Sequence, residues 1–137
     1  MLFRSLGEYQ KAKEYYEKAL AITTEIGDRI GEGRTYGNLG NVFESLGEYQ
    51  KAKEYYEKAL ALATEIGDRQ GEGTYSASLG SVFLSLRINR QAKDHFEKAL
   101  AISIEIGDRK MEACCYGNLA NLSRLFQIGR ASCRERV

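Results

Sequence analysis

The sequence predicts an all-α solenoid of antiparallel helix pairs, and three observations lead to that prediction. A segment of 23 residues that starts at Gly7 returns at Gly47 with two substitutions, and a more diverged copy starts at Arg87. The period of 40 residues is typical of stacked helical units, each of which buries its apolar face on its neighbours. Proline is absent, and apolar residues recur with the spacing of a helical face.

Each repeat unit is expected to contain two helices. One face of the first helix in a unit carries, at positions i, i+3, i+4 and i+7, the residues Tyr36, Leu39, Gly40 and Phe43. Gly47 and Gly67 stand where helices should end, because glycine readily adopts the left-handed conformation at a helix C-terminus. Asp68 is expected to cap the next helix. The predicted helices span residues 8–26, 29–46, 48–66, 69–86, 88–106 and 109–126.

The expected core sets large side chains on one helix against small ones on its partner. A buried Tyr or Phe ring needs a hole opposite it, and Gly40, Ala52 and Ala59 supply that hole. The predicted core residues are Tyr36, Leu39, Phe43, Ala52, Tyr56, Ala59, Leu79, Phe83, Phe96 and Ala99.

This pattern resembles the tetratricopeptide repeat (TPR) family, whose motif is W-x2-L-G-x2-Y … A-x3-F … A … P. One unit matches it with Tyr36, Leu39, Gly40, Phe43, Ala52, Tyr56 and Ala59, and the next with Leu79, Gly80, Phe83, Ala92, Phe96 and Ala99. The unit departs from the family in being longer than about 34 residues and in having Thr64 and Ile104 where the motif ends in proline. The resemblance implies a right-handed superhelix. The long units are similar to those of Pins-type G-protein-signalling adaptors and of long invertebrate TPR arrays.

The array is expected to occupy residues 1–127, and both of its ends look artificial. It divides into a partial first unit at 1–28, full units at 29–68 and 69–108, and a partial last unit at 109–127. The chain is expected to open within a helix, with Met1 as an internal methionine or a truncated start. Residues 128–137 resemble a translated sequencing adapter and are expected to be a non-native tail. Without capping helices, apolar faces near Phe3, Leu119 and Leu122 are expected to stay uncovered, so that the isolated chain self-associates or is only marginally stable.

Composition and charge exclude several function classes. The 20 Lys and Arg residues balance 19 Asp and Glu residues, which argues against a nucleic-acid partner. No apolar run approaches the roughly 18 residues that cross a membrane. Three cysteines make no disulfide framework, so a reducing, cytoplasmic location is expected.

No pattern of residues in the chain predicts catalysis, a cofactor or a metal site. The string GEGRTYG, at residues 31–37, is not the phosphate-binding G-x-G-x-x-G and follows a helix instead of a strand. His95 is the only histidine and takes the place of Tyr55, so it is expected to be a packing or surface aromatic. Cys114 and Cys115 point about 100° apart on a helix, which favours structural thiols, with Cys115 packed and Cys114 partly exposed.

The candidate binding site is the face of the first helices that does not pack in the core, because these helices line the concave groove in the TPR family. Asn38, Asn41 and Ser45 form one stripe, and an Asn amide can both donate to and accept from the backbone of an extended peptide. The alternative is that these amides only bond neighbouring helices or water. The predicted groove residues are Arg34, Asn38, Asn41, Glu44, Ser45, Ser78, Ser81, Asn118 and Asn121.

The groove is nearly neutral and has no lysine at these positions, which disfavours a receptor for acidic chaperone tails. The predicted ligand is an extended or short helical peptide segment of another protein, held by the Asn amides and by apolar pockets near Leu84 and Leu125. The sequence thus predicts a non-catalytic protein–protein interaction scaffold, a fragment of a larger signalling adaptor. The alternative is a sensor segment of a multidomain protein whose catalytic domain lies elsewhere.

Overall fold

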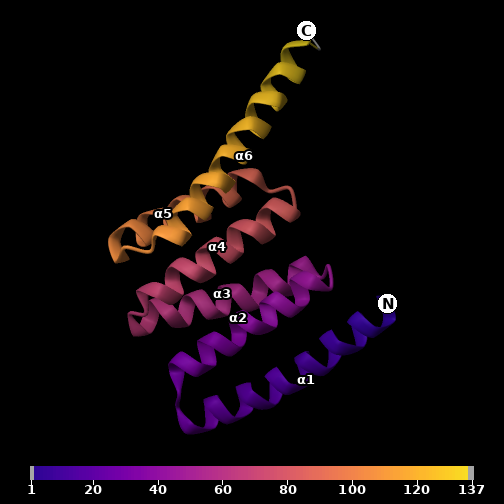
Figure 1. Ribbon diagram of the computed structural model, residues 1–137, viewed down its shortest axis with the longest axis vertical. Helices are drawn as coiled ribbons and strands as arrows, with labels where there is room; N and C mark the ends of the chain where they lie inside the picture. Colours follow the sequence, from indigo (N-terminus) through magenta and orange to yellow (C-terminus); the bar gives the residue numbers. More distant parts are fainter. Residues whose placement is uncertain (1, 136–137) are drawn as a thin grey trace.

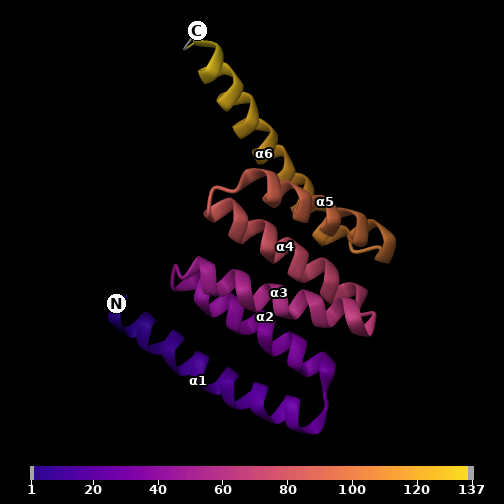
Figure 2. The ribbon, with the colours of Figure 1, turned by 180° about the vertical axis from the view of Figure 1, so that it is seen from behind.

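In residues 2–135, six helices form a single stack in which each helix packs against the next one along the chain (Figure 1). The computed structural model describes the backbone of residues 2–135 and the side chains of residues 7–129. The helices are α1 (Leu2–Ile26), α2 (Arg29–Ser45), α3 (Tyr49–Ile66), α4 (Arg69–Ser85), α5 (Asn89–Ile106) and α6 (Arg109–Glu135). Seen from behind, α1 and α6 again lie at opposite ends of the stack (Figure 2). The predicted all-α solenoid is confirmed, and no strand occurs in residues 2–135.

The turns between helices follow the predicted capping residues. Gly47 and Gly67 adopt φ of +77° and +74°, the left-handed conformation expected at a helix C-terminus. The Asp68 carboxylate accepts a hydrogen bond of 3.0 Å from the backbone N–H of Gly71, which caps α4. Asp28 caps α2 in the same way, so the two full units begin identically.

Two predicted helix boundaries are wrong by more than a residue or two. We expected a helix from residue 8, but α1 runs unbroken from Leu2 through Gly7. We expected α6 to end at 126, but it continues to Glu135 and extends away from the stack (Figure 1). Gln127 occupies the position of Gly47, so no glycine favours a helix end there. The hydrogen bonds within α6 therefore continue past this position to Glu135.

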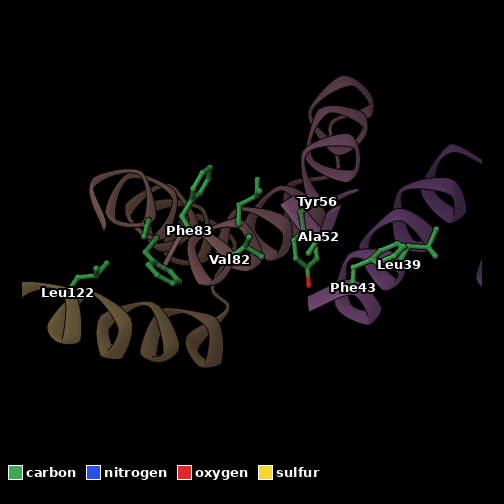
Figure 3. Packing of buried hydrophobic residues seen from close by; sticks show 10 residues of the cluster. Leu39, Phe43, Ala52, Tyr56, Val82, Phe83 and Leu122 are labelled. Atoms are coloured by element: carbon green, nitrogen blue, oxygen red, sulfur yellow. The ribbon is translucent and has the colours of Figure 1, made fainter. Parts of the chain in front are cut away.

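The core forms where each large ring meets a glycine. A Cβ on Gly40 would lie 2.6 Å from the Tyr56 ring, and one on Gly80 would lie 2.8 Å from the Phe96 ring. A Cβ at either position would have to displace the ring or the helices, so glycine allows the closest approach of α2 to α3 and of α4 to α5. Figure 3 shows buried side chains continuing from Leu39 on α2 to Leu122 on α6.

Nine of the ten predicted core residues are buried. Tyr36 is the exception. Its ring is half-buried and lies at the edge of the α2–α3 interface, 6.2 Å from the ring of Tyr55. The prediction that Leu122 is uncovered is also wrong, because Leu122 is 1% exposed and belongs to the core cluster, with Leu119 packed partly against it. The Phe3 side chain lies outside the described residues.

Candidate functional site

A pocket of about 340 Å³ lies between α2 and α4. It is lined by Ile30, Arg34, Gly37, Asn38, Asn41, Tyr56, Asp68, Gln70, Gly71, Thr74, Tyr75 and Ser78. The helical repeat explains this lining, because positions 34, 38 and 41 lie on one face of α2, and positions 74 and 78 repeat two of them on α4. Arg34 and Asp68 are the charged residues of the lining, so their charges offset one another.

Four of the predicted groove residues meet in this pocket, namely Arg34, Asn38, Asn41 and Ser78. Arg34 is exposed, whereas Asn38 and Ser78 are half-buried. The side chains offer a guanidinium, two amides and a hydroxyl. Together they can donate to and accept from a polar ligand without adding a net negative charge.

Two predicted groove residues, Asn41 and Glu44, are engaged by the core residue Tyr56. The Tyr56 hydroxyl lies 2.5 Å from Asn41 Oδ1 and 2.8 Å from Glu44 Oε2. A hydroxyl has a single proton, so it donates to the Glu44 carboxylate and accepts from the Asn41 amide when that amide turns its NH2 inward. Burial, followed by the bond to Glu44, raises the pKa of Tyr56. Asn41 is thus bonded to a residue of the neighbouring helix α3 and also lines the pocket.

Glu44 also joins one unit to the next. The Ser81 hydroxyl on α4 donates to Glu44 Oε1 at 3.1 Å. In the following unit Phe96 replaces Tyr56, and Leu84 replaces Glu44. The hydroxyl and its carboxylate acceptor are lost together, which leaves no buried polar group unpaired at that position. Leu84 packs partly against the core there and does not line the pocket.

The remaining predicted groove residues lie outside the pocket. Asn118 on α6 donates to the Cys114 carbonyl of its own helix at 3.1 Å. Asn121 is exposed on the same helix, and Ser45 is exposed at the last residue of α2. The predicted stripe is thus divided between a pocket on α2 and α4 and a separate surface on α6.

Sequence reasoning missed Tyr75, which forms one wall of the pocket. Its ring fills the space opposite Gly37, where a Cβ would lie 2.5 Å from a ring carbon. Burial raises the pKa of Tyr75, as does Asp68, while Arg34 opposes them. A comparison of the units could have found Tyr75, because this large ring stands where the preceding unit has the small side chain of Thr35.

The residues considered for catalysis have structural surroundings. The His95 ring stacks on Phe83 with centroids 5.2 Å apart, as Tyr55 stacks on Phe43 at 5.3 Å, which confirms the predicted packing role. Burial lowers the pKa of His95. Cys115 is buried and Cys114 is exposed, and both are free thiols. Among the described residues, no group of three or more His, Cys, Asp or Glu side chains is placed to hold a metal.

None of the helices in the described part of the chain has the length and apolar character needed to cross a bilayer.

Comparison with known sequences gives a family match over the first part of the chain. The tetratricopeptide repeat family model matches residues 1–65. Over 31 residues the chain is 58% identical to G-protein-signaling modulator 1 of Homo sapiens and 55% identical to that of Mus musculus. These matches cover 23% of this chain and 5% of each relative, so the chain spans about a twentieth of the length of the curated relatives it matches.

Comparison with solved structures supports the same fold over more of the chain. One similar structure is a signal transduction ATPase with a tetratricopeptide repeat sensor from Pyrococcus horikoshii. Its TM-score is 0.76 at 24% identity, and the match covers 81% of this chain and 17% of that one. Another, described as a kinesin light chain with nearly identical TPR-like repeats, comes from Podospora anserina. Its TM-score is 0.73 at 17% identity, covering 88% of this chain and 60% of that one.

Proposed function

Because the chain matches the tetratricopeptide repeat model and has the fold of such repeats, we propose that it is a non-catalytic scaffold for protein–protein interaction. It binds an extended peptide segment of a partner in the pocket between α2 and α4. The observation that carries this proposal is the convergence of Arg34, Asn38 and Ser78 on one open pocket. The matched family model describes a repeat and not an enzyme.

The peptide is held mainly through its backbone and polar side chains. Asn38 supplies both a donor and an acceptor, and Arg34 supplies donors to carbonyl or carboxylate oxygens. The Asp68 carboxylate at the same pocket offsets the charge of Arg34, so a strongly acidic peptide gains little there. The preferred ligand is therefore a nearly neutral segment, in keeping with the absence of lysine from the lining.

Selection of peptides from a random display library tests this proposal and requires no named partner. The affinities of the selected peptides are measured by fluorescence polarisation for Asn38→Ala and Ser78→Ala. We expect each substitution to weaken binding several-fold, since each removes about one hydrogen bond, worth roughly 1 kcal/mol. Asn118→Ala is the matched control, because Asn118 lies on α6 outside the pocket. Peptides that lose affinity only with the control would contradict the proposed site.

We further propose that the chain belongs to a larger cytoplasmic signalling adaptor. The short similarity to G-protein-signaling modulator 1 supports this assignment. The second candidate is a sensor segment of a multidomain protein, a setting in which the repeat of the similar Pyrococcus horikoshii ATPase is found. Sequencing the source transcript through the codon of Gln127 and upstream of Met1 separates the two. Further repeats followed by short G-protein-binding motifs favour the adaptor, whereas a catalytic domain favours the sensor.

Copies of the chain are also proposed to contact one another through the exposed faces of α1 and α6, which we call the end faces. Large apolar side chains are exposed at both ends of the stack, with Tyr15 on α1 and Tyr116 on α6 as examples. Such surfaces favour association.

A further inference from the structure

The first helix exposes a face that its counterpart in the next unit buries. On α1, Tyr15 is 68% exposed and Ile22 is 57% exposed. Their equivalents on α3 are Tyr55, which stacks on Phe43 of α2, and Leu62, which is 7% exposed and lies against Gly33 of α2. The open face of α1 is therefore the one that α3 uses to contact α2.

The last helix exposes the matching face. Tyr116 on α6 is 52% exposed, whereas its equivalent Tyr36 on α2 lies beside Tyr55 of α3. Ala113 and Ala120 are exposed on α6 at the positions of Gly33 and Gly40, which α3 covers on α2. The open face of α6 is therefore the one that α2 uses to receive α3. The two ends of the stack are the two halves of one interface that recurs inside it.

An Arg–Glu ion pair also recurs between the two helices of a unit. Arg29 at the start of α2 bonds Glu65 near the end of α3 at 2.7 Å, and Arg69 bonds Glu105 in the same way one unit later. The next arginine in the series is Arg109, which contacts Glu112 of its own helix and whose side chain is 85% exposed. The glutamate that precedes the series is Glu25, exposed near the end of α1. Each end thus carries one partner of the recurring ion pair.

Building on the proposed self-association, we infer that a second copy of this chain docks head to tail, with its α1 packed on α6 as α3 packs on α2. In this register Glu25 of the second copy meets Arg109, and Tyr15 of the second copy lies beside Tyr116. The contact is heterologous, so every docked copy leaves the same two faces free at its ends. Copies of this chain therefore form open, growing arrays.

The ion pair provides a test of the register in the full chain. Self-association is measured by sedimentation velocity over a range of concentrations for Glu25→Arg and for Arg109→Glu. We expect each variant alone to associate about threefold more weakly than the parent chain, the scale of an exposed ion pair. An equimolar mixture of the two should regain association, because each end of one variant then faces the complementary end of the other. Failure of the mixture to exceed either variant alone would overturn the register.

The packing provides an independent test, in which the removal of a methyl group is expected to strengthen association. The register places Tyr16 of the second copy on Ala120, where the Cβ occupies the space that Gly40 leaves open beneath Tyr56. Ala120→Gly should therefore strengthen association several-fold. Removal of a methyl group from a non-specific apolar contact would weaken association instead, and that result would overturn the inference.

A third pair of variants tests whether association depends on the end faces or on any exposed apolar residue. Ile22→Glu should weaken association more than tenfold, since it replaces an apolar side chain buried at the junction. Ile104→Glu is the matched control, because Ile104 is 54% exposed on α5, away from both end faces. A chain that stays monomeric at all concentrations would refute the proposed self-association as well. Association that responds equally to both variants would refute only the head-to-tail register, and peptide binding in the pocket is measured separately.

Discussion

Replacing Gly40 by alanine probes how closely α2 and α3 approach. A Cβ at this position would lie 2.6 and 2.7 Å from two carbons of the Tyr56 ring. The ring cannot move aside easily, because Tyr56 is 1% exposed and its hydroxyl is bonded to Glu44 at 2.8 Å. The added methyl group must therefore push the two helices apart or displace the ring.

Two opposing contributions decide the net effect. Alanine is favoured over glycine in a helix interior by about 1 kcal/mol. Overpacking a close-packed core costs about 1–3 kcal/mol, and the upper end applies when a rigid, enclosed ring must shift. We expect Gly40→Ala to lower the free energy of unfolding by about 2 kcal/mol. Gly117→Ala is the control, because no atom lies within 4 Å of a Cβ there, and it should raise stability by up to about 1 kcal/mol.

Urea unfolding followed by far-ultraviolet circular dichroism measures both changes, at protein concentrations low enough to limit self-association. Opposite signs for the two alanines are the expected result. If Gly40→Ala were as stable as the parent chain while Gly117→Ala gained stability, the close contact between Gly40 and the Tyr56 ring would be refuted.

Three further predictions follow from single residues. Arg87 has φ of +63° where Gly47 stands in the preceding unit, so Arg87→Gly should raise the melting temperature by relieving about 1 kcal/mol of strain, and Gly47→Arg should lower it. Burial lowers the pKa of His95, so the unfolded chain binds more protons below about pH 6.5 and stability falls as the pH drops through that range. His95→Tyr should remove this loss in unfolding curves recorded at several pH values. The hydrogen bond from Arg69 lowers the pKa of Glu72, so its contribution is present above about pH 4.3 and is lost as the pH falls through the lower folded pKa; Glu72→Gln should flatten the acid unfolding profile.

Much of the fold could be predicted because the same contacts between helices recur in successive units. Gly40 and Gly80 lie opposite Tyr56 and Phe96, and the spacing alone places each pair at one interface. The end helices could not be predicted in this way. Gly7 has the sequence surroundings of Gly47, yet α1 continues through it and Gly7 does not adopt the positive φ of Gly47. A glycine permits the left-handed conformation without imposing it.

The candidate site was predicted less completely, because helical spacing identifies a face but not the partners that face it. Asn41 and Glu44 lie on the predicted stripe, yet the Tyr56 hydroxyl reaches both from the core. Tyr75 was missed because its ring enters the pocket from α4, through a contact between units that the pattern within one unit does not show.

The Tyr56–Glu44 bond and the recurring Arg–Glu pairs join residues of the same unit, so they have a consequence for how such a gene can change length. The segments 7–29 and 47–69 are nearly identical. Unequal recombination between them adds or removes 40 residues, which is one whole repeat period. Since α1 then takes the place of α3 beside α4 with almost the same side chains, the shortened or lengthened array keeps a native junction. Such exchange changes the length of the array in steps of one unit.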